Sequence, residues 1–212
     1  MKLSALSLGS FPDPLAFKSA RRVVPNLIEL GDALAAAVAQ SSKDSLGYVV
    51  IADADCLVRY HRDEVFREAV RSAKTLICGG WPSAVLIYLL RGMWPAICSG
   101  SNLMGNIIKR LRPNDRILWI GGQHLQIYEL ASRYNLIDLR HFSFDKDKRN
   151  SRSVQACVEF IERQGSFRFC VLAIDSPHSE LIAHALLSRK RARGVVLCVG
   201  KLHYLRRCAH RP

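Results

Sequence analysis

Short apolar runs rich in β-branched residues alternate along this chain with longer amphipathic segments. This alternation is the sequence feature that most restricts the folds the chain can adopt. The clearest runs are Gly47–Ala52, Thr75–Cys78, Arg116–Ile120, Phe167–Ile174 and Gly194–Val199. Runs that are apolar throughout are typical of strands in a parallel sheet that helices cover on both sides. The sequence therefore predicts an α/β fold with a mostly parallel, Rossmann-like sheet and helices on both faces.

The segments between these runs have helical periodicity, and one more strand is expected at Leu136–Phe142. Pro82–Leu90 is so apolar that we expect its helix to be buried. The chain of 212 residues fits a single domain overall. In it, residues 1–46 form an N-terminal segment whose helix packs on the core, and residues 47–212 form the Rossmann-like domain. Helices are predicted at Val24–Gln40, Arg62–Ser72, Pro82–Leu90, Asn102–Leu111, Gln123–Tyr134, Ser151–Arg163 and Pro177–Leu187.

The charge of the chain is strongly positive, with 31 Lys and Arg against 18 Asp and Glu, a net charge of +13. No acidic residue follows Glu180. Such a basic end suits an anionic partner: nucleic acid, lipid phosphates or a nucleotide-sugar diphosphate. We expect its loops to face an anionic surface at the edge of the sheet that carries the catalytic residues. The alternative is a tail that only keeps the domain soluble. The cations of this end are Arg189, Lys190, Arg191, Arg193, Lys201, Arg206, Arg207 and Arg211.

The seven cysteines contain no CxxC pair. An odd number without metal-ligand spacing indicates reduced, buried thiols in the cytoplasm, and we expect no metal. The start of the chain, Met1–Leu6, lacks the apolar region of a signal peptide. The longest apolar stretch, Ala84–Leu90, is far shorter than the ~20 residues of a spanning helix. Any membrane contact is therefore expected to be peripheral.

Open parallel sheets bind ligands beyond the carboxyl ends of their strands, so the residues after each strand carry the functional information. Asp53 and Asp55 follow the first strand; they could act as a base or hold sugar hydroxyls, or form an ordinary solvated turn. Gly79 and Gly80 follow the second strand, where they permit close approach of a ligand to the backbone or simply make a tight turn.

Two further loops suit phosphate or nucleotide binding. The helix start at Gly100, Ser101 and Asn102 offers free N–H groups to a phosphate, unless Ser101 or Asn102 simply caps the helix. The other loop follows the strand Arg116–Ile120. It lacks the last glycine of a dinucleotide fingerprint and the Lys of a P-loop, yet it could admit a nucleotide. Its residues are Gly121, Gly122 and Gln123.

A last loop combines carboxylates, hydroxyls and an imidazole at the start of a helix, Asp175–Glu180. Ser176 before Pro177 is expected to cap that helix. Ser179 and Glu180 follow in its first turn.

Taken in order, these loops resemble the WecG/TagA/CpsF glycosyltransferases (glycosyltransferase family 26). The resemblance runs from about Gly47 to the end of the chain and is carried by five blocks in the family's order. They are GYVVIADAD (Gly47–Asp55), DEVFREAVRSAKTLICGGWPSAVLIYLLRG (Asp63–Gly92), SGSNLMGNII (Ser99–Ile108), RILWIGGQHLQIYELASRY (Arg116–Tyr134) and VLAIDSPHSELIAHALLSRKRARGVVLCVG (Val171–Gly200).

The resemblance implies an inverting, UDP-sugar-dependent hexosyl- or N-acetylhexosaminyltransferase of cell-wall or exopolysaccharide synthesis. Such enzymes use a lipid-linked diphosphate acceptor, work on the cytoplasmic face of the plasma membrane and need no divalent metal or other cofactor. The implied partners are a nucleotide sugar, that acceptor and an anionic membrane surface; nucleic acid is not expected, and a homo-oligomer is left open.

The chain departs from the family pattern at several polar positions. The family's aspartate, its candidate base, falls on Gly79, and its Thr and Asn after the first strand fall on Ile51 and Asp53. An Arg falls on Ile97 and a Gln on Ser179, whereas Pro177 and Glu180 are kept. The family's C-terminal membrane-binding appendage is expected to be absent.

Three functions follow as alternatives. The first is an active transferase with a rearranged site, in which Asp53 or Asp55 is the base and Glu180 a weaker candidate. The second is a catalytically degenerate relative that binds a nucleotide sugar or a partner without turnover. The third is an unrelated nucleotide-dependent enzyme or a nucleic-acid binder.

Overall fold

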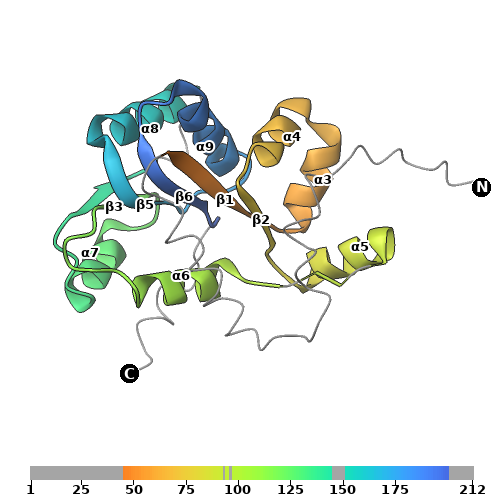
Figure 1. Ribbon diagram of the computed structural model, residues 1–212, viewed down its shortest axis with the longest axis horizontal. Coiled ribbons are helices and arrows are strands. Elements are labelled where there is room, and N and C mark those ends of the chain that lie inside the picture. The colour runs from red at the N-terminus through yellow and green to blue at the C-terminus, as the bar shows by residue number, and fades with distance from the viewer. Residues whose placement is uncertain (1–44, 93, 96, 145–150, 201–212) are drawn as a thin grey trace, which may run out of the picture.

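A computed structural model describes residues 45–92, 94–95, 97–144 and 151–200 of the chain. Its centre is one six-stranded sheet with the order β2-β1-β6-β5-β3-β4, and every neighbouring pair is parallel (Figure 1). The predicted α/β fold is therefore confirmed. The strands are β1 (Leu46–Ala52), β2 (Thr75–Cys78), β3 (Ile117–Ile120), β4 (Leu139–Phe142), β5 (Ser166–Leu172) and β6 (Arg193–Cys198).

Helices cover both faces of the sheet. One face carries α3, α4, α8 and α9, and the other carries α6 and α7 (Figure 1). α5 packs beside α3 at the β2 end of the sheet. The helices are α3 (Ala54–Arg62), α4 (Glu64–Arg71), α5 (Trp81–Arg91), α6 (Gly100–Ile108), α7 (His124–Arg133), α8 (Ser151–Gln164) and α9 (His178–Arg189).

Two apolar cores lie on the two faces of the sheet. Successive residues of a strand point to opposite faces, so Tyr48 and Val50 enter the core beneath α9 while Val49 enters the core beneath α6. Both cores draw on the same strands, which explains why the strands read as continuous apolar runs. Six described cysteines are unpaired and buried, as expected: Cys56, Cys78, Cys98, Cys157, Cys170 and Cys198.

Three helix starts differ from what the sequence suggested. Residues 54–62 form the helix α3, which was not predicted, and Asp53, for which a solvated turn was one alternative, caps it. α6 is capped by Ser99 and begins at Gly100, so neither Ser101 nor Asn102 is its cap. α9 begins at His178 after a cis Ser176–Pro177 peptide bond, and no side chain caps it.

The helix α5 is also less buried than its apolar sequence suggested. It packs on α3 through one side only, and Tyr88 and Leu89 on its other side are exposed. The predicted helix Val24–Gln40 and most of the predicted segment 1–46 lie outside the described residues, so these expectations stay predictions.

The basic end of the chain divides between the two edges of the sheet. α9 ends and β6 begins at the amino edge, and Arg189, Lys190, Arg191 and Arg193 therefore lie opposite the edge at which the strands end. Arg189 contacts Glu162 there at 3.5 Å. The expectation that these four cations face the catalytic edge is wrong, because a crossover helix returns the chain to the start of the next parallel strand. The remaining cations of the end, from Lys201 on, lie outside the described residues.

Candidate active site at the carboxyl edge of the sheet

All predicted ligand-binding loops meet at the edge where the strands end. Gly79 follows β2, Gly121 follows β3 and Ser176 follows β5. Gly100 opens α6 beside the end of β6, where an added Cβ would lie 3.0 Å from the carbonyl oxygen of Val199. The prediction that these four positions share one edge is confirmed. β3 and β5 are neighbours whose following helices cover opposite faces, which is the topology at which open sheets bind ligands.

Asp53 stands at the end of β1 as the N-cap of α3. Its Oδ1 accepts a hydrogen bond from the backbone N–H of Cys56 at 2.8 Å. The residue is exposed. The cap holds the carboxylate at the helix start, and its second oxygen stays available to a substrate.

Glu180 lies in the first turn of α9 and is 3% exposed. Its Oε2 accepts a hydrogen bond from the Ser179 hydroxyl at 2.9 Å. The pKa of Glu180 is raised, chiefly by burial, and the hydrogen bond from Ser179 offsets part of this shift. Asp53 follows β1 and Glu180 lies in the first turn of the helix that follows β5, so both belong to the edge at which the strands end. That they face one cleft stays a prediction.

The third predicted carboxylate, Asp55, turns away from this pair. It lies in the first turn of α3 and forms an ion pair with Arg59 at 3.2 Å, one helical turn further on. Its side chain is 64% exposed. A surface ion pair of this kind contributes little to stability. Asp55 is therefore a poorer candidate base than Asp53.

An apolar cluster of Ile51, Gly79 and Ile97 lies next to Asp53. Gly79 donates its N–H to the carbonyl oxygen of Ala52 at 2.8 Å, and an added Cβ would lie 2.7 Å from Cγ2 of Ile51. Ile97 forms a parallel bridge with Cys78, the residue before Gly79. The positions that resemble the family's Thr, Asp and Arg thus lie together and carry no polar side chain.

Ser99 caps the start of α6, where the sequence predicts a phosphate site. The Ser99 hydroxyl accepts the N–H of Asn102 at 3.2 Å, and Asn102 is itself exposed. The other N–H groups of a first helical turn have no carbonyl partner within the helix. Gly100 and Ser101 provide such groups beside the end of β6, which agrees with the predicted phosphate site.

The glycine loop after β3 needs its glycines. Gly121 and Gly122 have φ values of +86° and +77°, a left-handed conformation that L side chains rarely adopt. An added Cβ on Gly121 would lie 2.7 Å from the carbonyl oxygen of Ala173 after β5. Gln123 follows at the cap position of α7, without a capping hydrogen bond from its side chain.

Two histidines flank this loop, and the sequence analysis missed both. His141, in β4, has its Nε2 3.1 Å from the carbonyl oxygen of Gly121, and its ring packs edge-on against His124 with centroids 5.4 Å apart. Burial lowers the pKa of His141, the Gly121 carbonyl raises it, and His124 lowers it. Only their places in the sequence could have pointed to these histidines. His124 follows the glycine loop, and His141 lies near the end of the next strand.

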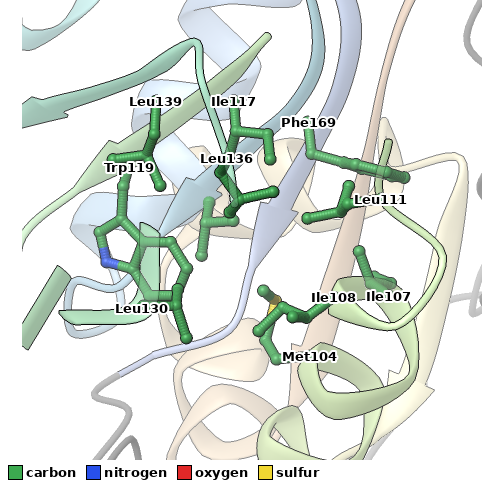
Figure 2. Close-up of a pocket in the computed structure, with 11 residues that line it drawn as sticks. Met104, Ile107, Ile108, Leu111, Ile117, Trp119, Leu130, Leu136, Leu139 and Phe169 are labelled. Atoms are coloured by element: carbon green, nitrogen blue, oxygen red, sulfur yellow. The ribbon is translucent and has the colours of Figure 1, made fainter. Parts of the chain in front are cut away.

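The pocket that the structure contains elsewhere is not part of this site. It lies in the core beneath α6 and α7, and Figure 2 shows that apolar side chains line it. Met104, Ile107 and Trp119 are among them. A nucleotide sugar needs polar partners that this lining does not offer, so the pocket belongs to the apolar core.

A family model described as the glycosyl transferase WecG/TagA/CpsF family matches residues 24–203 of the chain. The protein belongs to the WecG/TagA/CpsF family. A search of curated proteins finds no match. The family match confirms the assignment suggested by the five blocks, and it begins before β1, within the part of the chain that the structure does not describe.

As a WecG/TagA/CpsF protein, the chain is notable for what its carboxyl edge keeps and loses. Pro177 and Glu180, which the resemblance matches to the family pattern, both lie at this edge. So does Gly79, the position at which the resemblance places the family's candidate base. Within the described residues, no helix has the length and apolar character needed to cross a bilayer.

Proposed function

We propose that this protein transfers a sugar, with inversion, from a UDP-sugar to a lipid-linked diphosphate acceptor. In this proposal it acts on the cytoplasmic face of a bacterial membrane, in cell-wall or exopolysaccharide synthesis. The observation that carries the proposal is that Asp53 and Glu180 both lie at the carboxyl edge, at the starts of α3 and α9. Membership of the glycosyltransferase family supports the reaction class.

Asp53 is the group that we assign to the acceptor proton. As the acceptor hydroxyl oxygen bonds to the anomeric carbon, the bond from that carbon to the UDP oxygen breaks, and the hydroxyl proton moves to the free oxygen of Asp53. General-base catalysis of this kind contributes about 100- to 10,000-fold to a rate. Glu180 is too buried to meet the substrate, so we assign it the role of positioning the start of α9.

The departing diphosphate needs hydrogen-bond donors. We assign to it the N–H groups at the start of α6, from Gly100 and Ser101, because the positive end of a helix dipole favours an anion. The loop of Gly121 and Gly122 lies further along the same edge. The N–H and the carbonyl of Gly121 are paired with Phe142 and His141, so we assign the exposed Gly122 to the nucleotide. This donor site requires no metal and no other cofactor.

A second candidate function is donor binding without turnover. The specific observation in its favour is the apolar cluster of Ile51, Gly79 and Ile97 at the family's polar positions. An enzyme that has lost its base without replacement retains binding but loses most of its rate.

One experiment separates these functions. Thermal unfolding of the full chain is measured with a panel of UDP-sugars, and any stabilising donor is then assayed for UDP release with a lipid-diphosphate acceptor. A ligand at 100 times its Kd stabilises the folded state by about 2.7 kcal/mol, which a thermal shift detects. Binding with UDP release supports transfer, binding without release supports the second candidate, and no stabilisation by any UDP-sugar overturns both.

A further inference from the structure

Four large apolar side chains form an exposed patch at the start and outer side of α5. Trp81, Tyr88, Leu89 and Trp94 are 66%, 49%, 73% and 46% exposed. Trp94 packs edge-on against Trp81 and Tyr88, with ring centroids 6.2 and 5.7 Å apart. We call these four residues the aromatic patch. Contiguous exposed apolar surface of this kind marks an interaction site.

The aromatic patch lies beside the candidate active site. Trp81 follows Gly79 and Gly80 directly, so the patch begins where β2 ends. The opposite side of α5 is closed, since Ser83 and Ala84 are buried and the helix packs on α3. Figure 1 shows α5 at the border of the molecule, beyond the β2 end of the sheet.

The chemistry of the patch and of its surroundings suits an anionic lipid surface. Tryptophan and tyrosine combine an apolar ring with a polar group, and they gather where hydrocarbon meets water. The sequence contains no acidic residue between Glu68 and Asp115. In that interval Arg91 ends α5 itself, whereas Arg71, Lys74, Lys109, Arg110 and Arg112 precede β2 and β3 and therefore lie at the amino edge.

The net charge argues against a second copy of the chain as the occupant. A surplus of +13 makes two copies repel each other, whereas it attracts a surface of acidic lipids. α5 has 11 residues, too few to span a bilayer, so the contact lies in the interface.

We propose that the aromatic patch docks on an anionic phospholipid bilayer and holds the carboxyl edge of the sheet at the membrane surface. The proposal rests on the proposed function, because a lipid-linked acceptor presents its diphosphate at that surface. It assigns membrane contact to α5 in place of the cations Arg189 to Arg193, which the fold puts at the other edge.

Tryptophan fluorescence of the full chain tests this directly. The chain has three tryptophans, and Trp119 is 1% exposed, so changes in emission report on Trp81 and Trp94. The protein is titrated with vesicles of phosphatidylcholine and phosphatidylglycerol, with and without brominated acyl chains. We expect a blue shift and quenching by the brominated lipid, both weaker with pure phosphatidylcholine.

Two matched variants locate the contact. Leu89→Asp adds a charge to the patch and should lower vesicle affinity at least tenfold, about 1.4 kcal/mol. Val65→Asp makes the same kind of change at a 66% exposed position of α4 and should bind like the parent. Equal binding by both variants, or no blue shift with anionic vesicles, overturns the proposal.

Other occupants of the patch give different results. A blue shift that depends on protein concentration without vesicles indicates a second copy, and blue-shifted emission of the dilute free protein indicates coverage by its own chain. Either result overturns membrane docking. UDP-sugar binding is measured without vesicles, so a protein that binds vesicles but no donor contradicts the proposed function alone. A protein that binds a donor but no vesicles contradicts docking alone.

Discussion

Ile51 occupies the space that a side chain at Gly79 would need. A Cβ on Gly79 would lie 2.7 Å from Cγ2 of Ile51 and 3.2 Å from the carbonyl oxygen of Ala52. The resemblance to the WecG/TagA/CpsF family places a Thr and the candidate base at these two positions. Isoleucine at one position and glycine at the other are therefore matched in shape, and the family's carboxylate cannot be restored by one substitution without a rearrangement of Ile51.

Gly79→Ala should destabilise the protein by about 1–3 kcal/mol, because it overpacks the contact with Ile51. The double variant Ile51→Ala, Gly79→Ala should cost less than the two single changes together, with a coupling energy of about 1 kcal/mol or more. Urea unfolding of the parent, both single variants and the double variant measures this. Additive costs would show that the two side-chain positions do not compete for space.

Asp53→Asn should lower any sugar transfer by about 100- to 10,000-fold, because the amide cannot take the acceptor proton. Its stability should stay close to that of the parent, because asparagine caps a helix as well as aspartate does. The control Asp53→Ala loses both functions and should unfold about 1 kcal/mol more easily. UDP release and urea unfolding are measured on all three proteins, and transfer by Asp53→Asn at the parental rate would rule Asp53 out as the base.

Ser99→Ala should destabilise the protein by about 0.5–2 kcal/mol, because the hydroxyl that caps α6 is lost. Ser101→Ala, two residues further on, serves as the matched control and should leave stability within about 0.5 kcal/mol of the parent, since no capping bond comes from it. Thermal unfolding of both variants without ligand decides this. A larger loss for Ser101→Ala would contradict the assignment of the cap.

Glu180→Gln should change how stability depends on pH. The pKa of Glu180 is raised, chiefly by burial, so the folded state holds its proton more tightly than the unfolded state. The stabilisation is complete below the ordinary glutamate value of 4.5 and is lost as pH rises through the raised pKa. The stability of Glu180→Gln relative to the parent should therefore increase from about pH 4.5 upward. Urea unfolding at several pH values measures it, with the exposed Glu129→Gln as control; an offset that does not vary with pH would contradict the raised pKa.

Much of the fold could be read from the sequence. The apolar runs predict five of the six strands of the described sheet because a strand covered on both faces needs apolar residues at every position. The sixth, the edge strand β4, was also expected, although it contains Arg140 and His141. α3 was missed because its Asp53 and Asp55 look like a turn, whereas the carboxylate of Asp53 satisfies a helix N–H instead. α5 was expected to be buried because composition cannot tell which neighbours a helix has, and only one side of it packs on α3.

The sequence by itself determined the alternating α/β pattern, the family and the set of loops that lie beyond the strands. Only the tertiary structure decided which members of that set come together. Asp53 and Glu180 are far apart in the chain, yet β1, β5 and β6 are parallel and adjacent, so the helices that follow β1 and β5 start at the same edge. The same geometry carries Arg189 to Arg193 to the opposite edge, since α9 must run back to the start of β6. Neither the shared edge of Asp53 and Glu180 nor the opposite placement of Arg189 to Arg193 can be read from positions in the sequence. Both depend on the order and direction of the strands in the sheet.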